Sequence, residues 1–182
     1  MNVRIISGEF GGRKIEAPDN SRTHPMGERI RNALFNSIGG DIKSADVLDV
    51  FAGTGAVGLE ALSRGARHVT FIEKDRIAQK ILAKNITTLG AEDRTDIIRT
   101  TAVNWLKNNE DKSYDFIFAD PPYYDPQLST AEQFLGLLKP GGCMILSHPG
   151  RGEDLTGTGV VVVDNRSYGN AFLTFYRREK DA

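Results

Sequence analysis

The stretch Leu48-Asp49-Val50-Phe51-Ala52-Gly53-Thr54-Gly55-Ala56-Val57-Gly58 decides the fold of this chain. An apolar run leads into a glycine-rich turn, and the turn leads into a helical pattern. In open α/β sheets such a turn follows the first strand and brings backbone N–H groups close to a bound ligand. The stretch therefore predicts an α/β fold with a binding site at the carboxyl end of this strand.

From residue 46 onward the chain repeats this alternation of short apolar runs and helical patterns, which is typical of βαβ units. We expect parallel strands at Val47–Phe51, His68–Glu73, Thr95–Thr100, Tyr114–Ala119 and Cys143–Ser147. Helices are expected at Ala56–Arg64, Arg76–Leu89, Ala102–Asn108 and Leu128–Leu138, the last ending at Lys139-Pro140-Gly141-Gly142. Two closing strands at Val160–Val163 and Ala171–Tyr176, joined by a polar turn through Asn165 and Gly169, should pair antiparallel. The pattern predicts a doubly wound, mostly parallel seven-stranded sheet with an antiparallel edge strand.

The first 45 residues depart from this alternation. Val3–Ile6 and Arg13–Ile15, separated by glycines, predict a small hairpin, and Met26–Ile38 predicts an amphipathic helix. We find no internal repeat and no linker long enough to divide the chain. The sequence therefore predicts one domain over residues 1–182, with an N-terminal extension over 1–45 and a catalytic core over 46–182.

Composition limits the setting of the protein. The chain has 182 residues, of which 40% are hydrophobic and 26% are charged, and this is typical of soluble globular domains. A lone Cys143 cannot form an internal disulfide or a Cys-rich metal site, and no signal peptide or membrane span is expected. We therefore expect a cytoplasmic protein with no membrane partner. The net charge of −1 leaves any electrostatic attraction for nucleic acid to a local patch; residues 1–40 carry six Lys/Arg against four acids.

Two ligand classes compete for the glycine turn. Gly53-x-Gly55-x-x-Gly58 spells the dinucleotide fingerprint, and Glu73 lies 20 residues after Gly53, near the position of an NAD-binding acid. Asp49 argues against NAD, because an anion at the strand end would repel a pyrophosphate. A carboxylate there suits the ammonium of S-adenosylmethionine, and Glu73 suits its ribose hydroxyls. The remaining interpretation is a tight turn whose glycines serve packing alone.

The stretch from Asp49 to Gly55, with an acid at the next strand end, resembles the S-adenosylmethionine motifs of Rossmann-like methyltransferases. The resemblance implies a cofactor site at Asp49, Phe51, Gly53, Gly55, Glu73 and Lys74. The third strand end would border the adenine ring. Because it lacks the acid that methyltransferases often carry there, backbone atoms of Thr101 and Ala102 would have to serve.

Asp120-Pro121-Pro122-Tyr123 follows a buried-strand pattern and should lie at the same sheet edge as the glycine turn. Two prolines remove two N–H donors and hold the loop extended, so that its carbonyls can accept hydrogen bonds. The Asp120 side chain and the Pro121 carbonyl can accept both N–H groups of a base amino group, while Tyr123 stacks on the base. The tetrapeptide predicts methylation of an exocyclic amino nitrogen on an unpaired base, with no metal. Alternatively, the segment is a Pro-Pro turn with a surface tyrosine.

The N-terminus extends the resemblance to a specific family. Five segments resemble the bacterial 16S ribosomal RNA guanine-N2 methyltransferases of the small subunit: 4–8, 12–15, 28–36, 51–55 and 58–65, with further matches at 168–170 and 175–176. The family implies N2-methylation of one guanine in 16S rRNA, with S-adenosylhomocysteine as product, on an assembling 30S particle. It implies that the N-terminal hairpin and the stretch from His24-Pro25 to Arg31 flank the active site and contact RNA or cofactor. The substrate contacts that it implies are Arg13, His24, Arg29 and Pro122. We expect a monomer.

The chain differs from the family pattern at three places. His24-Pro25-Met26 replaces the usual Arg-Pro-Thr, and Ser147-His148 stands where the fifth strand usually ends in an acidic segment. Tyr123 replaces a frequent Phe. Two alternatives stay open. The first is an adenine-N6 or other amino-methyltransferase acting on DNA or another RNA. The second is a non-catalytic ribosome-assembly factor that binds RNA through the N-terminal segment.

Overall fold

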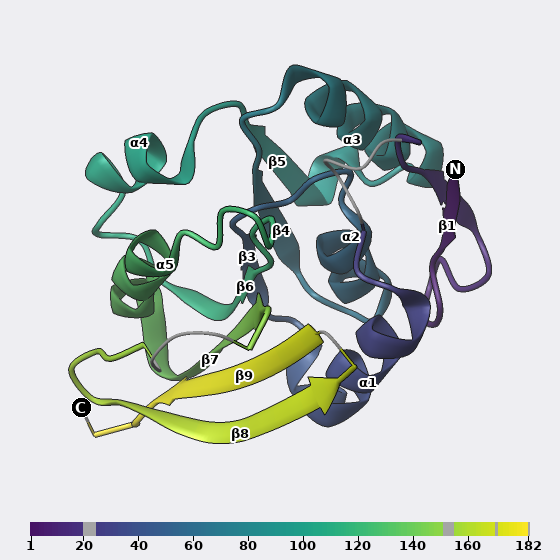
Figure 1. Cartoon of the computed structure of the whole chain (residues 1–182). Helices are drawn as coiled ribbons and strands as arrows, with labels where there is room; N and C mark the ends of the chain where they lie inside the picture. Colours follow the sequence, from purple (N-terminus) through teal and green to yellow (C-terminus); the bar gives the residue numbers. More distant parts are fainter. Residues whose placement is uncertain (20–24, 151–154, 170, 182) are drawn as a thin grey trace.

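The computed structural model describes residues 1–19, 25–150, 155–169 and 171–181, and within them the main sheet has the strand order β5-β4-β3-β6-β7-β9-β8 (Figure 1). Five strands are parallel: β3 (Asp46–Asp49), β4 (His68–Ile72), β5 (Thr95–Ile98), β6 (Tyr114–Ala119) and β7 (Leu138–His148). The strand β9 (Ala171–Arg178) pairs antiparallel with both β7 and β8 (Val160–Tyr168). The predicted α/β fold, with its mostly parallel seven-stranded sheet and antiparallel edge, is confirmed.

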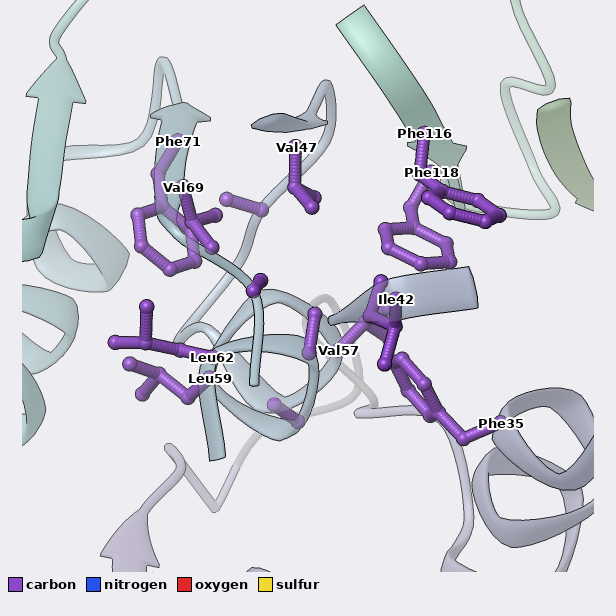
Figure 2. Packing of buried hydrophobic residues seen from close by; sticks show 14 of the residues in the cluster. Phe35, Ile42, Val47, Val57, Leu59, Leu62, Val69, Phe71, Phe116 and Phe118 are labelled. Carbon is purple, nitrogen blue, oxygen red and sulfur yellow. The ribbon is translucent and has the colours of Figure 1, made fainter. Parts of the chain in front are cut away.

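Helices cover both faces of this sheet (Figure 1). One face packs against α1 (Glu28–Ile38), α2 (Ala56–Ser63) and α3 (Arg76–Leu89), and the other against α4 (Ala102–Lys107) and α5 (Leu128–Phe134). Side chains alternate along β3 as the pleat requires, so that Val47 joins the first core and Leu48 the second. Figure 2 shows the first core, where Phe35 of α1 and Phe118 of β6 approach to 5.5 Å between ring centroids.

The predicted helix over Leu128–Leu138 is too long. The α-helix ends at Phe134, a 3₁₀ turn follows at Leu135–Leu137, and β7 already begins at Leu138. The glycines after Pro140 lie inside the strand instead of forming a turn before it. Gly142 passes so close to β6 that an added Cβ would lie 3.0 Å from the Tyr114 carbonyl oxygen. The glycine therefore permits a close strand approach at an irregularity in the β6–β7 register.

Other element boundaries also differ from the prediction. The helix predicted from Met26 begins at Glu28, and β8 runs to Tyr168, so Asn165 lies within a strand and only Gly169 remains of the predicted turn. Besides the 3₁₀ turn before β7, the described residues form two further 3₁₀ turns, at Gly39–Ile42 and Glu92–Arg94. Over the described residues, no helix has the length and apolar character needed to cross a bilayer.

The N-terminal extension is attached to the core by a buried ion pair. Its hairpin consists of β1 (Asn2–Arg4) and β2 (Lys14–Glu16), paired antiparallel as predicted. Arg31 of α1 and Glu60 of α2 are 1% and 0% exposed, with Nε and Oε1 3.4 Å apart. Glu60 also accepts the backbone N–H groups of Ile6 and Ser7, and Arg31 donates to the Met26 carbonyl at 2.9 Å. These contacts fix the segment before α1 relative to the glycine turn.

Candidate active site

A cavity of about 670 Å³ opens at the carboxyl edge of the parallel strands. This is the edge at which open α/β sheets bind their ligands. The ends of β3, β4, β6 and β7, the residues after β5 and the segment before α1 all contribute to its wall. The lining includes every predicted cofactor residue except Gly55, together with the whole Asp-Pro-Pro-Tyr tetrapeptide.

The glycine turn follows β3 and begins α2. Gly53 and Gly55 have φ values of 58° and 94°, in the left-handed region that favours glycine. A Cβ on Gly55 would lie 2.5 Å from a methyl carbon of Leu82, so this glycine also permits close packing of α3. The turn thus serves both packing and the cavity, and Gly55 supports the loop without lining the cavity itself.

Asp49 ends β3 and lies at the base of the cavity, where it is 2% exposed. Its Oδ2 accepts the N–H of Gly58 in the first turn of α2 at 3.1 Å. Burial raises the pKa of Asp49 to about 8, with a further contribution from the charge of Asp120, against the opposing effect of the Gly58 N–H. A cation in the cavity would favour the ionised carboxylate.

Glu73 follows β4 and connects the second strand end to the glycine turn. One carboxylate oxygen accepts the Gly53 N–H at 2.7 Å, and the other accepts the Asp75 N–H at 2.8 Å. Burial raises the pKa of Glu73, and these two N–H groups partly offset that effect. Since each carboxylate oxygen can accept two hydrogen bonds, the side chain retains acceptor capacity for hydroxyl groups in the cavity.

The other predicted cofactor residues also lie along the wall. Thr101 is the N-cap of α4, where its hydroxyl accepts the Asn104 N–H at 3.1 Å, and Ala102 is the first residue of that helix. The helix leaves its first N–H groups near the cavity. Phe51 and the exposed Lys74 complete the set.

The Asp-Pro-Pro-Tyr tetrapeptide follows β6 directly. Asp120 is partly buried, and burial raises its pKa to about 6 while a hydrogen bond from Ser147 lowers it. The register that pairs Ala119 with Leu146 places Asp120 beside Ser147 at the ends of adjacent parallel strands. The Tyr123 hydroxyl lies 2.9 Å from the Ser147 Oγ, and the tyrosine side chain remains 40% exposed. Pro121 and Pro122 line the cavity between them.

The charge of the cavity wall separates the two ligand classes. Four carboxylates line it (Asp49, Glu73, Asp75 and Asp120), against a single ammonium at Lys74. A pyrophosphate in this wall would face several carboxylates, whereas a sulfonium and an ammonium would be attracted to them. These carboxylates therefore fit S-adenosylmethionine. Over the described residues, no cluster of three His, Cys, Asp or Glu side chains is suited to a metal ion.

The predicted substrate residues divide into three groups. Pro122 lines the cavity, and Arg29 is exposed on the first turn of α1 beside the lining residues Gly27 and Ile30. Arg13 does not line the cavity, because its guanidinium donates to the Thr88 carbonyl at the end of α3 at 2.7 Å. His24 lies outside the described residues.

The sequence reasoning missed part of the lining. Ser147 is 4% exposed and reaches the cavity from the end of β7, although the sequence drew attention to it only as a departure from a family pattern. Tyr124, Gln127 and Ala171 also line the cavity and were missed, whereas Pro25, Met26, Gly27 and Ile30 belong to the stretch expected beside the active site. An exposed aromatic after the tetrapeptide was a usable signal for Tyr124.

The sheet order, the glycine turn and the carboxylates at successive strand ends define the class of S-adenosylmethionine-dependent methyltransferases. The family described as "Conserved hypothetical protein 95" matches residues 3–177. The chain belongs to this family, whose curated relatives include the ribosomal RNA small subunit methyltransferases D.

Individual relatives support the same assignment. The ribosomal RNA small subunit methyltransferase D of Haemophilus influenzae is 37% identical over 138 residues, 75% of this chain and 70% of the relative. The Escherichia coli enzyme of that name is 38% identical over 140 residues, 77% of this chain and 68% of the relative. Among solved structures, the Escherichia coli protein yhhF, described as a proposed methyltransferase, is 32% identical with a TM-score of 0.89 and 99% coverage of both chains.

Proposed function

We propose that this protein transfers a methyl group from S-adenosylmethionine to the exocyclic N2 of a guanine in 16S ribosomal RNA, acting on assembling small-subunit particles. The observation that carries the proposal is the position of Asp120-Pro121-Pro122-Tyr123 on the wall of a cavity whose other acids suit a cationic cofactor. The names of the relatives support the choice of small-subunit RNA as substrate.

Each strand end then has a distinct task in holding the cofactor. Asp49 would pair with the ammonium, Glu73 would accept the ribose hydroxyls, and the backbone at Thr101 and Ala102 would border the adenine; all four residues line the cavity. When bound, S-adenosylmethionine would supply an electrophilic methyl group on sulfur and would leave as the thioether S-adenosylhomocysteine. The methylated nitrogen then has to lose one proton, and the Asp120 carboxylate, which accepts one of its N–H groups, is the acceptor that the site offers. The protein contributes alignment and electrostatics, which are the main requirements of an in-line transfer.

The tetrapeptide orients the amino group of the base. The Asp120 carboxylate and the Pro121 carbonyl accept its two N–H groups, which directs the nitrogen lone pair toward the cavity interior. Tyr123 lies flat against the base, a contact worth about 1–3 kcal/mol in single-stranded recognition. Because a paired base cannot enter this cavity, the target guanine must be unpaired or flipped out when it is methylated.

The direct test is to incubate the protein and labelled S-adenosylmethionine with 30S particles from a strain that lacks the protein, and to identify the methylated nucleoside by mass spectrometry. We expect N2-methylguanosine in 16S rRNA. Recovery of N6-methyladenosine would replace the guanine assignment with the adenine one. Free 16S rRNA in a parallel reaction tests whether an assembled particle is required.

A matched pair of variants tests the role of the tetrapeptide. Asp120→Ala should abolish turnover while largely sparing cofactor affinity, measured by isothermal titration calorimetry. Asp125→Ala removes an exposed acid from the same loop that does not line the cavity, and it should behave as the wild type. If Asp120→Ala loses affinity and turnover together, Asp120 is mainly a cofactor ligand. The absence of cofactor binding to the wild type at millimolar concentration would contradict the enzyme assignment itself.

A further inference from the structure

Ser147 occupies a position that the proposed reaction does not yet explain. It is the tenth residue of β7, it is 4% exposed, and it lines the cavity. The pairing of Ala119 with Leu146 places it next to Asp120, so a small polar side chain stands beside the carboxylate that holds the base amino group. Buried hydroxyls of this kind nearly always have hydrogen-bond partners, and those of Ser147 identify its role.

The hydroxyl of Ser147 contacts two residues of the tetrapeptide. Its Oγ lies 2.9 Å from the Tyr123 hydroxyl, and its hydrogen bond lowers the pKa of Asp120. A serine hydroxyl has one proton to donate and two lone pairs to accept with. Above its pKa of about 6, the ionised Asp120 carboxylate can only accept, so the serine proton then points to Asp120 and the tyrosine proton to Ser147. The hydrogen bonds therefore run in one direction, from Tyr123 through Ser147 to Asp120.

We propose that Ser147 is a positioning residue for methyl transfer, which fixes the Tyr123 ring against the base and keeps Asp120 an ionised acceptor for the base amino group. This inference rests on the proposed function, because it assigns Ser147 a task at the same site. Without the serine, the Asp120 carboxylate loses a hydrogen-bond donor at a place where burial already raises its pKa. The Tyr123 ring also loses the only hydrogen bond of its hydroxyl recorded among the described residues.

Three variants separate the two effects. Ser147→Ala removes both hydrogen bonds. Tyr123→Phe removes only the hydrogen bond between the Tyr123 and Ser147 hydroxyls and retains the aromatic ring. Ser147→Thr keeps the hydroxyl and should restore most of the activity. In Ser147→Ala, we expect the pH at which kcat/KM falls on the acid side of its profile to rise by about one unit. This shift is the equivalent of one hydrogen bond to a charged group. The acid side of the profile should stay in place in Tyr123→Phe, with the loss confined to a higher KM for RNA.

The experiment has one readout that depends on activity and one that does not. Methyl transfer to 30S particles is measured from pH 5 to 8 for the wild type and the three variants. In parallel, the pKa of Asp120 is measured by carboxyl carbon NMR in the free proteins. A higher pKa in Ser147→Ala, unchanged in Tyr123→Phe and restored in Ser147→Thr, supports the proposal.

Two results would overturn the inference and one would overturn the function alone. If Asp120 titrates identically in Ser147→Ala and the wild type, Ser147 does not support the carboxylate. If activity falls by the same factor at every pH and Ser147→Thr does not restore it, the serine acts only through packing. If the wild type methylates no RNA while the Asp120 pKa still depends on Ser147, the proposed substrate is wrong and the hydrogen-bonded chain stands.

Discussion

Asp49→Asn should make the free protein more stable while weakening its affinity for the cofactor at least tenfold. Asp49 is 2% exposed, and burial together with the Asp120 charge raises its pKa from 3.8 to about 8. The folded protein therefore holds a proton on Asp49 between those two values, where the unfolded chain has lost it. The contribution of Asp49 to stability is full below pH 3.8 and falls as the pH rises toward 8.

The magnitude follows from the size of the pKa shift. Each pKa unit corresponds to about 1.4 kcal/mol. The ionisation of Asp49 therefore lowers the free energy of unfolding of the wild type at pH 7 by up to about 4 kcal/mol relative to pH 3. Asparagine keeps an oxygen for the Gly58 N–H and has no charge to desolvate. Its advantage over the wild type should grow from pH 4 to pH 8.

A second aspartate on the same strand provides a matched control, because its pKa is shifted in the opposite direction. Asp46 begins β3, and its carboxylate hydrogen-bonds Arg67 and, at 3.1 Å, Lys139. Burial of Asp46 opposes its ionisation, but these two cations outweigh burial and lower its pKa. Its contribution to stability is therefore present at neutral pH and lost as the pH falls through this lowered pKa. Asp46→Asn should destabilise the protein at pH 7 and have little effect in acid.

Urea unfolding of the wild type and both variants at pH 4, 6 and 8 measures these differences, and calorimetry measures cofactor binding. The reasoning fails if Asp49→Asn is no more stable than the wild type at pH 8, or if its advantage is the same at all three pH values. Binding of S-adenosylmethionine to the wild type near pH 7 should release the proton from Asp49. The observed binding enthalpy should then depend on the ionisation enthalpy of the buffer. Asp49→Asn should bind at least tenfold more weakly.

The remaining predictions concern the contacts that hold the N-terminal extension. Glu60→Gln should lower the free energy of unfolding by about 3–5 kcal/mol, because it leaves Arg31 buried without its counterion; Glu16→Gln, which affects the exposed pair with Lys84, should cost about 1 kcal/mol or less in the same urea titration. Asn85→Ala removes hydrogen bonds to Glu16 and to the Thr54 carbonyl, so about 2–3 kcal/mol of stability should be lost. Its cofactor affinity should also fall by about tenfold in calorimetry, and unchanged affinity would show that the hairpin does not support the glycine turn.

The acids of the cavity were predictable from the sequence because parallel strands place their carboxyl ends at one edge. Asp49, Glu73 and Asp120 each follow or end an apolar run, so their convergence required only the sheet to be parallel. Ser147 was different. Its place beside Asp120 depends on the β6–β7 register, which shifts at an irregularity near Tyr114 that no local pattern reveals.

The resemblance placed the N-terminal segment beside the cavity, but the contacts that hold it there were beyond local sequence reasoning. Met26 lines the cavity, and its carbonyl is held by Arg31, whose own position depends on Glu60. A buried charge pair between residues 29 positions apart has no periodic signature. The sequence indicated a local cationic patch in the first 40 residues, whereas one of its arginines, Arg31, is buried in the structure.

The energetic cost of Asp49 is itself an argument about the ligand. A buried acid with a raised pKa weakens the free protein, and an asparagine would make the same hydrogen bond to Gly58 without that cost. Such destabilising groups are typical of functional sites, where the bound ligand offsets the cost. A ligand with a positive charge near the end of β3 would offset this cost. A dinucleotide pyrophosphate would add to the cost, whereas the ammonium of S-adenosylmethionine would remove it.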